Sequence, residues 1–183
     1  TEAGLAEAAA TLKARLPDLP GPWVGVLVGG TSGSYRLGET EAAALGEALA
    51  AFAARHGVSL VVTPSRRTGD ANVALLAEAL AATPHFLWRG EGDNPLLGIY
   101  GCSEAFVVTC DSVNMIGEAA FTGKPILAWP LPGGRAKFRR FHEAMVRHGA
   151  MRWFDGSLPR ADYAPLDATG LVAEAIRSHL ANR

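Results

Sequence analysis

Residues 23–35 have the sequence WVGVLVGGTSGSY, and the architecture of the chain can be built outward from them. Residues 23–28 form a strongly apolar run, which predicts a buried strand. Gly29 and Gly30 then open a polar loop that extends to Gly38. Beyond this loop, apolar residues recur with the period of a helix at Ala42, Leu45, Leu49 and Phe52. The segment therefore predicts a strand, a glycine-rich loop and a helix, in that order.

The same alternation continues along the chain. Gly57 stands where a glycine ends a helix, and a β-branched strand is expected at 58–63. Further strands are expected at 85–88, 105–109, 126–129 and, at an edge, 151–154, with helices at 72–82, after Asn94-Pro95, and at 111–123, 137–148 and 168–181. Continuous apolar strands are buried on both faces, and strand–helix alternation implies right-handed crossovers. We therefore predict a doubly wound, Rossmann-like α/β fold with a parallel sheet.

Size and composition fit one ordered domain over residues 1–183. Hydrophobic residues make up 49% of the chain and charged residues 19%, as in globular proteins rather than disordered ones. The formal net charge is -1, so no global field would draw the protein onto nucleic acid or an anionic membrane. We therefore expect no nucleic-acid partner.

Neither a membrane span nor a signal peptide is recognisable, because no apolar run reaches the roughly 18 residues of a span. Cys102 and Cys110 lie in an apolar stretch without C-x-x-C spacing or nearby histidines, which predicts buried free thiols rather than a zinc site. We expect a cytoplasmic protein without a metal. Residues 1–20 read as an entering helix and linker, and we expect an N-terminal half before them, although removal of an initiator methionine would look the same.

Functional residues are expected in the loops after the strands, because ligands of open α/β sheets bind at the carboxyl ends of the strands. The first loop supplies Gly29, Gly30, Thr31 and Ser32, whose N–H groups and hydroxyls suit a phosphate. It matches neither G-x-x-x-x-G-K-[ST] nor G-x-G-x-x-G, so neither ATP hydrolysis nor a dinucleotide cofactor is indicated. An ordinary glycine turn is the alternative.

The loop TPSRRTG at 63–69 carries Ser65, Arg66 and Arg67. Guanidinium groups beside small hydroxyl residues suit phosphate oxygens, and the alternative is a solvated surface loop.

For two other loops, the sequence favours a structural role over ligand binding. Asn94 and Pro95 are typical of a helix N-cap and first helical residue. After the fifth strand, we expect Arg139 and Arg140 to be solvated and His142 to be packed rather than catalytic.

The loop and helix start after residue 109 hold the remaining candidates for ligand binding: Asp111, Ser112, Asn114, Met115 and Glu118. We expect Asp111 or Ser112 to cap this helix, whose exposed N–H groups suit a phosphate. The spacing of Asp111 and Glu118 predicts that both carboxylates face the same region, where a ribose diol would be a partner. The alternative for Glu118 is a solvent-facing helix residue. No G-x-S-x-G, H-E-x-x-H or paired-carboxylate motif is present, so catalytic residues stay unassigned.

The order of these motifs resembles the carboxyl-terminal half of GT-B-type glycosyltransferases. More closely, VGVLVGG, TPSRRTG, GDNPLLG, VVTCDSVNMIGEAAFTGKPI and KFRRFHEAMVRHGAMRWF resemble the mitochondrial fission protein family of plants and its bacterial relatives. Those bacterial relatives are often labelled nucleoside-diphosphate-sugar epimerases. This chain lacks both G-x-G-x-x-G and Tyr-x-x-x-Lys, the signatures expected of that class, so we set the label aside.

The resemblance implies a nucleotide-sugar-binding domain of a two-domain, GT-B-like protein. It places Gly29, Gly30 and Thr31 near the phosphates, Ser112 and Asn114 at the diphosphate, and Glu118 at the ribose. The ligand would be a nucleoside diphosphate or nucleotide-sugar, with no metal or other cofactor. Because a GT-B catalytic base normally comes from the amino-terminal domain, the chain alone is expected to be inactive. A non-catalytic protein-interaction module is the alternative, since folds host many functions.

Overall fold

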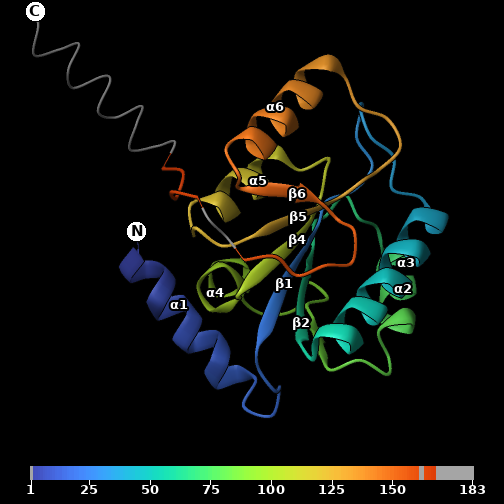
Figure 1. Ribbon diagram of the computed structural model, residues 1–183. Coiled ribbons are helices and arrows are strands. Elements are labelled where there is room, and N and C mark those ends of the chain that lie inside the picture. Colours follow the sequence, from blue (N-terminus) through green and yellow to red (C-terminus); the bar gives the residue numbers. More distant parts are fainter. Residues whose placement is uncertain (1, 161–162, 168–183) are drawn as a thin grey trace, which may run out of the picture.

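A six-stranded parallel sheet forms the centre of the protein, with the strand order β3-β2-β1-β4-β5-β6 (Figure 1). The computed structural model describes residues 2–160 and 163–167. The strands are β1 Trp23–Val28, β2 Ser59–Pro64, β3 His85–Leu87, β4 Ala105–Thr109, β5 Ile126–Trp129 and β6 Met151–Trp153. The helices are α1 Glu2–Arg15, α2 Glu39–His56, α3 Asp70–Ala79, α4 Leu96–Cys102, α5 Val113–Ala120 and α6 Ala136–Arg147. This is the doubly wound, Rossmann-like fold that the strand–helix alternation predicts.

The predicted ends of the helices differ from the observed ones by a few residues. The helix expected at 111–123 is α5, Val113–Ala120, because residues 121–123 leave the helix through bonds such as Thr122 N to Ala119 O, at 3.0 Å. The helix expected at Pro95 begins at Leu96, whose N–H donates to Asn94 Oδ1 at 3.0 Å. Gly57 ends α2 with φ 62°, as predicted. The helix expected at 168–181 lies outside the described residues.

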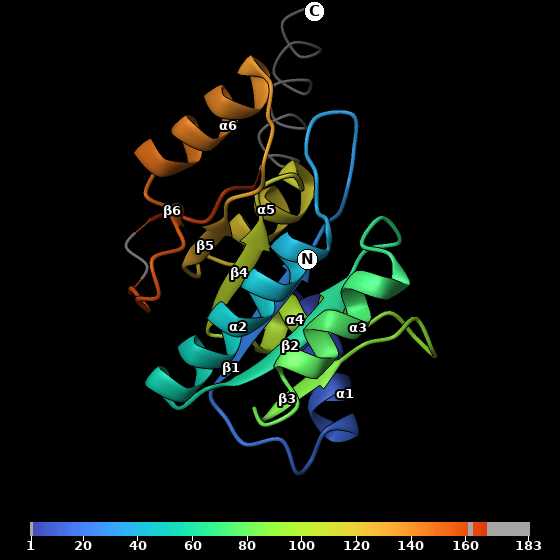
Figure 2. The same cartoon turned by 90° about the vertical axis from the view of Figure 1, so that its right-hand side faces the viewer.

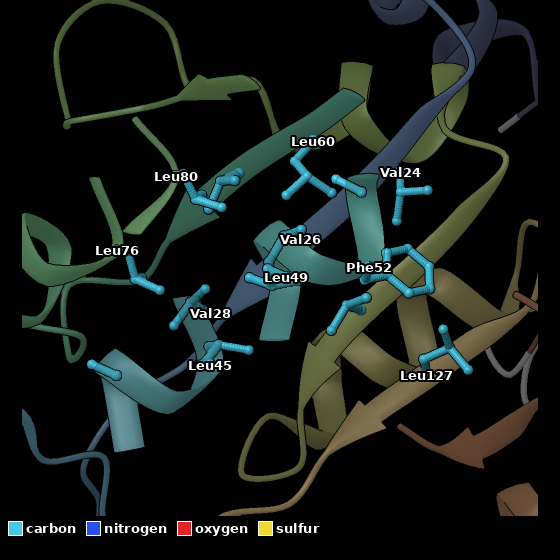
Figure 3. Packing of buried hydrophobic residues seen from close by; sticks show 14 of the residues in the cluster. Val24, Val26, Val28, Leu45, Leu49, Phe52, Leu60, Leu76, Leu80 and Leu127 are labelled. Atoms are coloured by element: carbon cyan, nitrogen blue, oxygen red, sulfur yellow. The ribbon is translucent and has the colours of Figure 1, made fainter. Parts of the chain in front are cut away.

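Helices cover both faces of the sheet, and β1 divides its side chains between them. Figure 2 shows α2 and α3 on one face, while α1, α4 and α5 lie on the other. In Figure 3, Val24, Val26 and Val28 lie beside α2 residues such as Leu45 and Leu49. Leu27 belongs to the opposite cluster, with side chains of α4 and α5. Both faces of β1 are therefore buried, as its continuous apolar run predicts.

The N-terminal helix α1 packs closely on α4, because two glycines of α4 let the helices approach. A Cβ atom at Gly101 would lie 2.3 Å from Leu5 O, and one at Gly98 would lie 2.7 Å from the Cβ of Leu12. Leu12 is buried in the same contact. The segment that the sequence predicts as an entering helix is thus part of one core with the sheet.

The parallel strands place several loops at one edge of the sheet. The loops after β1, β2, β4 and β5 follow neighbouring strands and are therefore adjacent there. The loop after β1 also pairs with the loop after β5, through Arg36 N to Pro132 O at 3.0 Å and the bridge between Tyr35 and Gly133. This edge contains the candidate functional site.

Candidate functional site

Asp111 joins the loops that follow β1, β2 and β4. Its Oδ2 atom accepts the N–H of Gly30 at 3.0 Å and lies 3.1 Å from Nη2 of Arg67. The carboxylate is fully buried, whereas the Arg67 side chain is 43% exposed. Oδ1 of Asp111 is buried without a hydrogen-bond partner in the described part of the chain. Asp111 is therefore a buried charged side chain that connects three loops at this edge of the sheet.

The lack of side chains at Gly29 and Gly30 lets this carboxylate and the loop after β2 approach the backbone closely. A Cβ atom at Gly29 would lie 2.3 Å from both carboxylate oxygens of Asp111, and one at Gly30 would lie 2.1 Å from Arg67 O. The N–H of Gly29 donates to Thr109 Oγ1 at 2.7 Å. The two N–H groups that the sequence offers to a phosphate are therefore occupied within the protein. The contact of these glycines with a phosphate stays a prediction.

Most hydroxyls of the first two loops also have partners inside the protein. Ser65 Oγ donates to Gly29 O at 2.9 Å and accepts the N–H of Arg67 at 3.2 Å. Thr31 Oγ1 bonds both the N–H and the carbonyl of Leu37, each at 3.1 Å. Ser32 Oγ accepts N–H groups of its own loop. These residues shape the loops more than they offer donors to a ligand.

Arg66 differs from Arg67 in its surroundings. Arg66 is exposed and makes no hydrogen bond or ion pair with any described residue. Arg67 also donates from Nη1 to Gly30 O at 3.3 Å. Because Arg67 is held beside Asp111, Arg66 is the more available cation of this loop.

Sequence reasoning missed the buried polar residues that hold these loops together. Thr109 receives the N–H of Gly29, and Thr68 Oγ1 donates to Val28 O at 3.1 Å. Asn72 Nδ2 donates to Leu37 O at 3.0 Å and to Thr68 O at 2.8 Å. The sequence contains one signal that could have identified Thr109 as such a residue, because it is a polar residue at the end of an otherwise apolar strand.

The start of α5 has unsatisfied backbone donors. The N–H groups of Val113, Asn114 and Met115 have no hydrogen-bond partner among the described residues. Ser112 occupies the N-cap position without a capping side-chain bond, and Asp111 turns toward Gly30 instead. Ser112 is therefore the N-cap residue, as expected, although neither side chain forms a capping hydrogen bond. Donors at a helix start suit an anion.

Glu118 lies two turns further along α5 and has a different partner from Asp111. Its Oε2 atom accepts the hydroxyl of buried Tyr100 from α4 at 2.8 Å. Burial and the bond to Glu118 raise the pKa of Tyr100 well above its usual range. Glu118 and Asn114 are exposed, and Met115 is half-buried against the core cluster on the α4 and α5 side of the sheet. Asp111 and Glu118 thus contact different elements, and the shared region that their spacing predicts is not seen in their contacts.

A cleft with a volume of about 470 Å³ lies beside the first loop and along α6. Tyr35, Cys110, Leu131 and His142 are its buried members. His142 Nε2 lies 2.8 Å from Cys110 O, and burial lowers the pKa of this imidazole. His142 is packed, as expected. Arg139 is exposed and also lines the cleft, as do Glu143, Val146, Arg147 and Trp153.

Among the described residues, no group of three or more His, Cys, Asp or Glu side chains is placed to hold a metal ion. Within the same residues, no helix is long and apolar enough to cross a membrane. Cys102 and Cys110 are buried and free, as the sequence predicts.

The parallel sheet and its carboxyl-edge loops define the chain as a doubly wound, Rossmann-like α/β domain. A UDP-GlcNAc 2-epimerase from Neisseria meningitidis, solved with bound UDP-GlcNAc, has a similar fold, with a TM-score of 0.51 at 15% identity. This match covers 93% of the chain and 39% of that protein. At this identity, the similarity concerns the fold alone.

The chain belongs to the mitochondrial fission ELM1 family, whose sequence model matches residues 1–180. It is 32% identical to the mitochondrial fission protein ELM1 of Arabidopsis thaliana, over 99% of the chain and 43% of that protein. It is also 24% identical to an uncharacterized protein of Rickettsia prowazekii (strain Madrid E), over 83% of the chain and 45% of that protein. The chain thus spans less than half the length of these two relatives.

Proposed function

We propose that this chain binds the diphosphate of a nucleoside diphosphate or nucleotide-sugar at the start of α5. The observation that carries the proposal is the set of unpartnered N–H groups at Val113, Asn114 and Met115. An anion placed there gains these donors and the favourable end of the helix dipole. The anion lies at the carboxyl edge of the sheet, where ligands of this fold class bind.

The guanidinium groups after β2 supply the positive charge. Arg67 reaches the residue before the N-cap of α5, because it contacts Asp111 at 3.1 Å. Arg66 is its exposed neighbour and is free of described partners. In this proposal Arg66 contacts the diphosphate, while Arg67 keeps Asp111 in place.

Glu118 holds the ribose in this proposal. Tyr100 binds one carboxylate oxygen, Oε2, and Oε1 has no hydrogen-bond partner among the described residues. A carboxylate oriented in this way can accept hydrogen bonds from a diol. The exposed position of Glu118 on α5, downstream of the N–H groups, suits a nucleoside attached to the diphosphate.

The proposed activity of the whole protein is glycosyl transfer of the GT-B type. The domain described here binds the nucleotide part of the donor, and the catalytic base comes from an amino-terminal domain, so this chain alone is inactive. We also infer a reducing, cytoplasmic location, which the free, buried thiols Cys102 and Cys110 support.

Thermal unfolding with UDP, GDP, ADP, CDP and sulfate tests the proposal. A ligand at about a hundred times its dissociation constant adds roughly 2.7 kcal/mol to the free energy of unfolding. We expect stabilisation by at least one nucleotide, weakened in Glu118→Ala. The same variant should respond to sulfate like the wild type, because sulfate has no ribose. Glu78→Ala, an exposed glutamate of α3, is the matched control.

The helix-start donors can be tested separately with Val113→Pro. Proline is favoured at the first helical position and removes only an N–H without a helical partner. Ser112 has ψ 76°, outside the helical region that a following proline disfavours. Loss of one bond to a charged phosphate should weaken nucleotide binding by about tenfold or more. Glu39→Pro at the start of α2, after extended Gly38 with ψ -176°, should leave binding unchanged.

Absence of any shift with all of these ligands would contradict the proposal and favour the protein-interaction module. A response to sulfate with no preference for any nucleotide would also contradict it, because it would indicate an anion site without a nucleoside.

A further inference from the structure

The cleft along α6 is separate from the proposed nucleotide contacts and has the character of a small-molecule site. Its volume of about 470 Å³ lies within the usual range of ligand pockets. Arg66, Glu118 and the unpartnered N–H groups of α5 are not among its lining residues. The cleft instead joins the end of β4 at Cys110 to α6 and β6.

Apolar side chains of this cleft are partly uncovered. Trp153 is 45% exposed and Val146 is 42% exposed, two of the three large hydrophobic side chains with this degree of exposure among the described residues. Both line the cleft, and buried Leu131 and Tyr35 lie deeper in it. A flat apolar group placed between them would remove this surface from water.

His142 supplies an oriented polar atom. Its Nε2 atom faces the carbonyl of Cys110, which can only accept, so Nε2 carries the proton. Nδ1 of the neutral ring is then an acceptor, and the hydrogen bond of Nε2 to Cys110 O is the ring's one hydrogen bond in the described part of the chain. Because His142 is itself buried, this acceptor is fixed in position.

The rim of the cleft carries cations without anionic partners. Arg139 and Arg147 lie about two turns apart on α6, and both line the cleft. Neither side chain forms an ion pair or hydrogen bond with a described residue, although Glu143 lies between them in sequence. Guanidinium groups at an apolar cleft select a ligand with a carboxylate, sulfonate or phosphate group.

We propose that this cleft binds a small aromatic acid. The ring packs against Trp153 and Val146, the acidic group contacts Arg139 or Arg147, and a hydrogen-bond donor of the ligand faces Nδ1 of His142. This site is additional to the nucleotide site and does not depend on it.

8-Anilinonaphthalene-1-sulfonate is a suitable probe, because it combines fused rings, an anilino N–H and a sulfonate. Its fluorescence on titration with the purified chain should report one site per chain. The double variant Arg139→Ala/Arg147→Ala should weaken binding by at least about tenfold, as loss of contacts to charged groups implies. Val146→Asp should abolish binding, because it places a carboxylate on the apolar wall. Arg140→Ala, an exposed arginine of α6 outside the cleft, should bind as the wild type does.

Near-ultraviolet circular dichroism and the thermal midpoint of each variant check that the fold is retained. We expect it to be retained because all four substituted side chains are exposed. Unchanged binding in the double variant or in Val146→Asp would overturn the proposal. An equal loss of affinity in Arg140→Ala would also overturn it, because that result would indicate attraction by the overall charge of α6. Absence of binding to the wild-type chain would also overturn it. None of these results depends on nucleotide binding, so the two proposals can fail separately.

Discussion

The guanidinium of Arg67 lies 3.1 Å from the carboxylate of Asp111, and this contact connects a half-exposed loop residue to a fully buried one. The carboxylate also accepts the N–H of Gly30 at 3.0 Å, so three strand-end loops depend on one side chain. The stability of the carboxyl edge is therefore concentrated at Asp111.

Asp111→Ala should destabilise the protein. The substitution leaves the buried N–H of Gly30 without an acceptor, which costs about 1–3 kcal/mol in the free energy of unfolding. Chemical denaturation measures this loss. Arg66→Ala, a neighbouring exposed residue without described partners, should change stability by no more than about 0.5 kcal/mol. Equal effects of the two substitutions would contradict the assigned role of Asp111.

Gly29→Ala should be far less tolerated than Gly33→Ala. A Cβ at Gly29 would meet both oxygens of Asp111 at 2.3 Å, whereas at Gly33 the nearest atom would be Nη2 of Arg135, at 4.0 Å. Crowding of this kind costs typically about 1–3 kcal/mol. The difference between the midpoints of urea unfolding measures it. If Gly29→Ala is as stable as Gly33→Ala, the close approach of the carboxylate to the backbone is wrong.

Tyr100→Phe should weaken nucleotide binding without changing the response to sulfate. The hydroxyl orients Glu118 through a 2.8 Å bond, and its loss should also cost about 0.5–1.5 kcal/mol of stability. A double-mutant cycle with Glu118→Ala, followed by nucleotide titration, isolates this contact. Additive effects of the two substitutions would show that the tyrosine does not act through the glutamate.

Stability should fall as the pH is lowered below about 6.5, in part because of His142. Burial lowers the pKa of this imidazole below its ordinary value of 6.5, so the unfolded chain takes up the proton first. Its contribution is complete above that value and decreases as the pH falls toward the folded-state pKa, by at most about 1.4 kcal/mol per pH unit. His142→Gln, whose amide can still donate to Cys110 O, should show a shallower decline. Denaturation between pH 5 and pH 7.5 compares the two, and parallel curves would contradict this origin.

The fold could be predicted well from the sequence because its main signals are local. The apolar runs of β1, β4 and β5 have the predicted bounds, and Gly57 ends α2 as expected. Each of these features depends on residues that are neighbours in the chain. The strand order then follows from general rules for parallel sheets.

The candidate site was less accessible to sequence reasoning because its contacts join distant elements. Asp111 looked like a helix cap, yet its partners lie in the loops after β1 and β2. The partner of Glu118 is Tyr100 in another helix, and nothing in the spacing of either residue indicates the other. Arg139 resembled any solvated arginine, and only the packing of α6 against the sheet places it at a cleft.

The glycine loop after β1 already contacts an anion of the same protein, the carboxylate of Asp111 in the loop after β4. The carboxylate of Asp111 is covalently tethered beside the N–H of Gly30, so its effective concentration there exceeds that of any free phosphate in solution. The N–H groups of Gly29 and Gly30 therefore have partners inside the protein, and in the proposed complex a phosphate would lie next to the carboxylate rather than in its place. The sequence pattern that predicts a phosphate-binding loop therefore forms an internal contact here, because a carboxylate of the same protein occupies an N–H group that a phosphate would use.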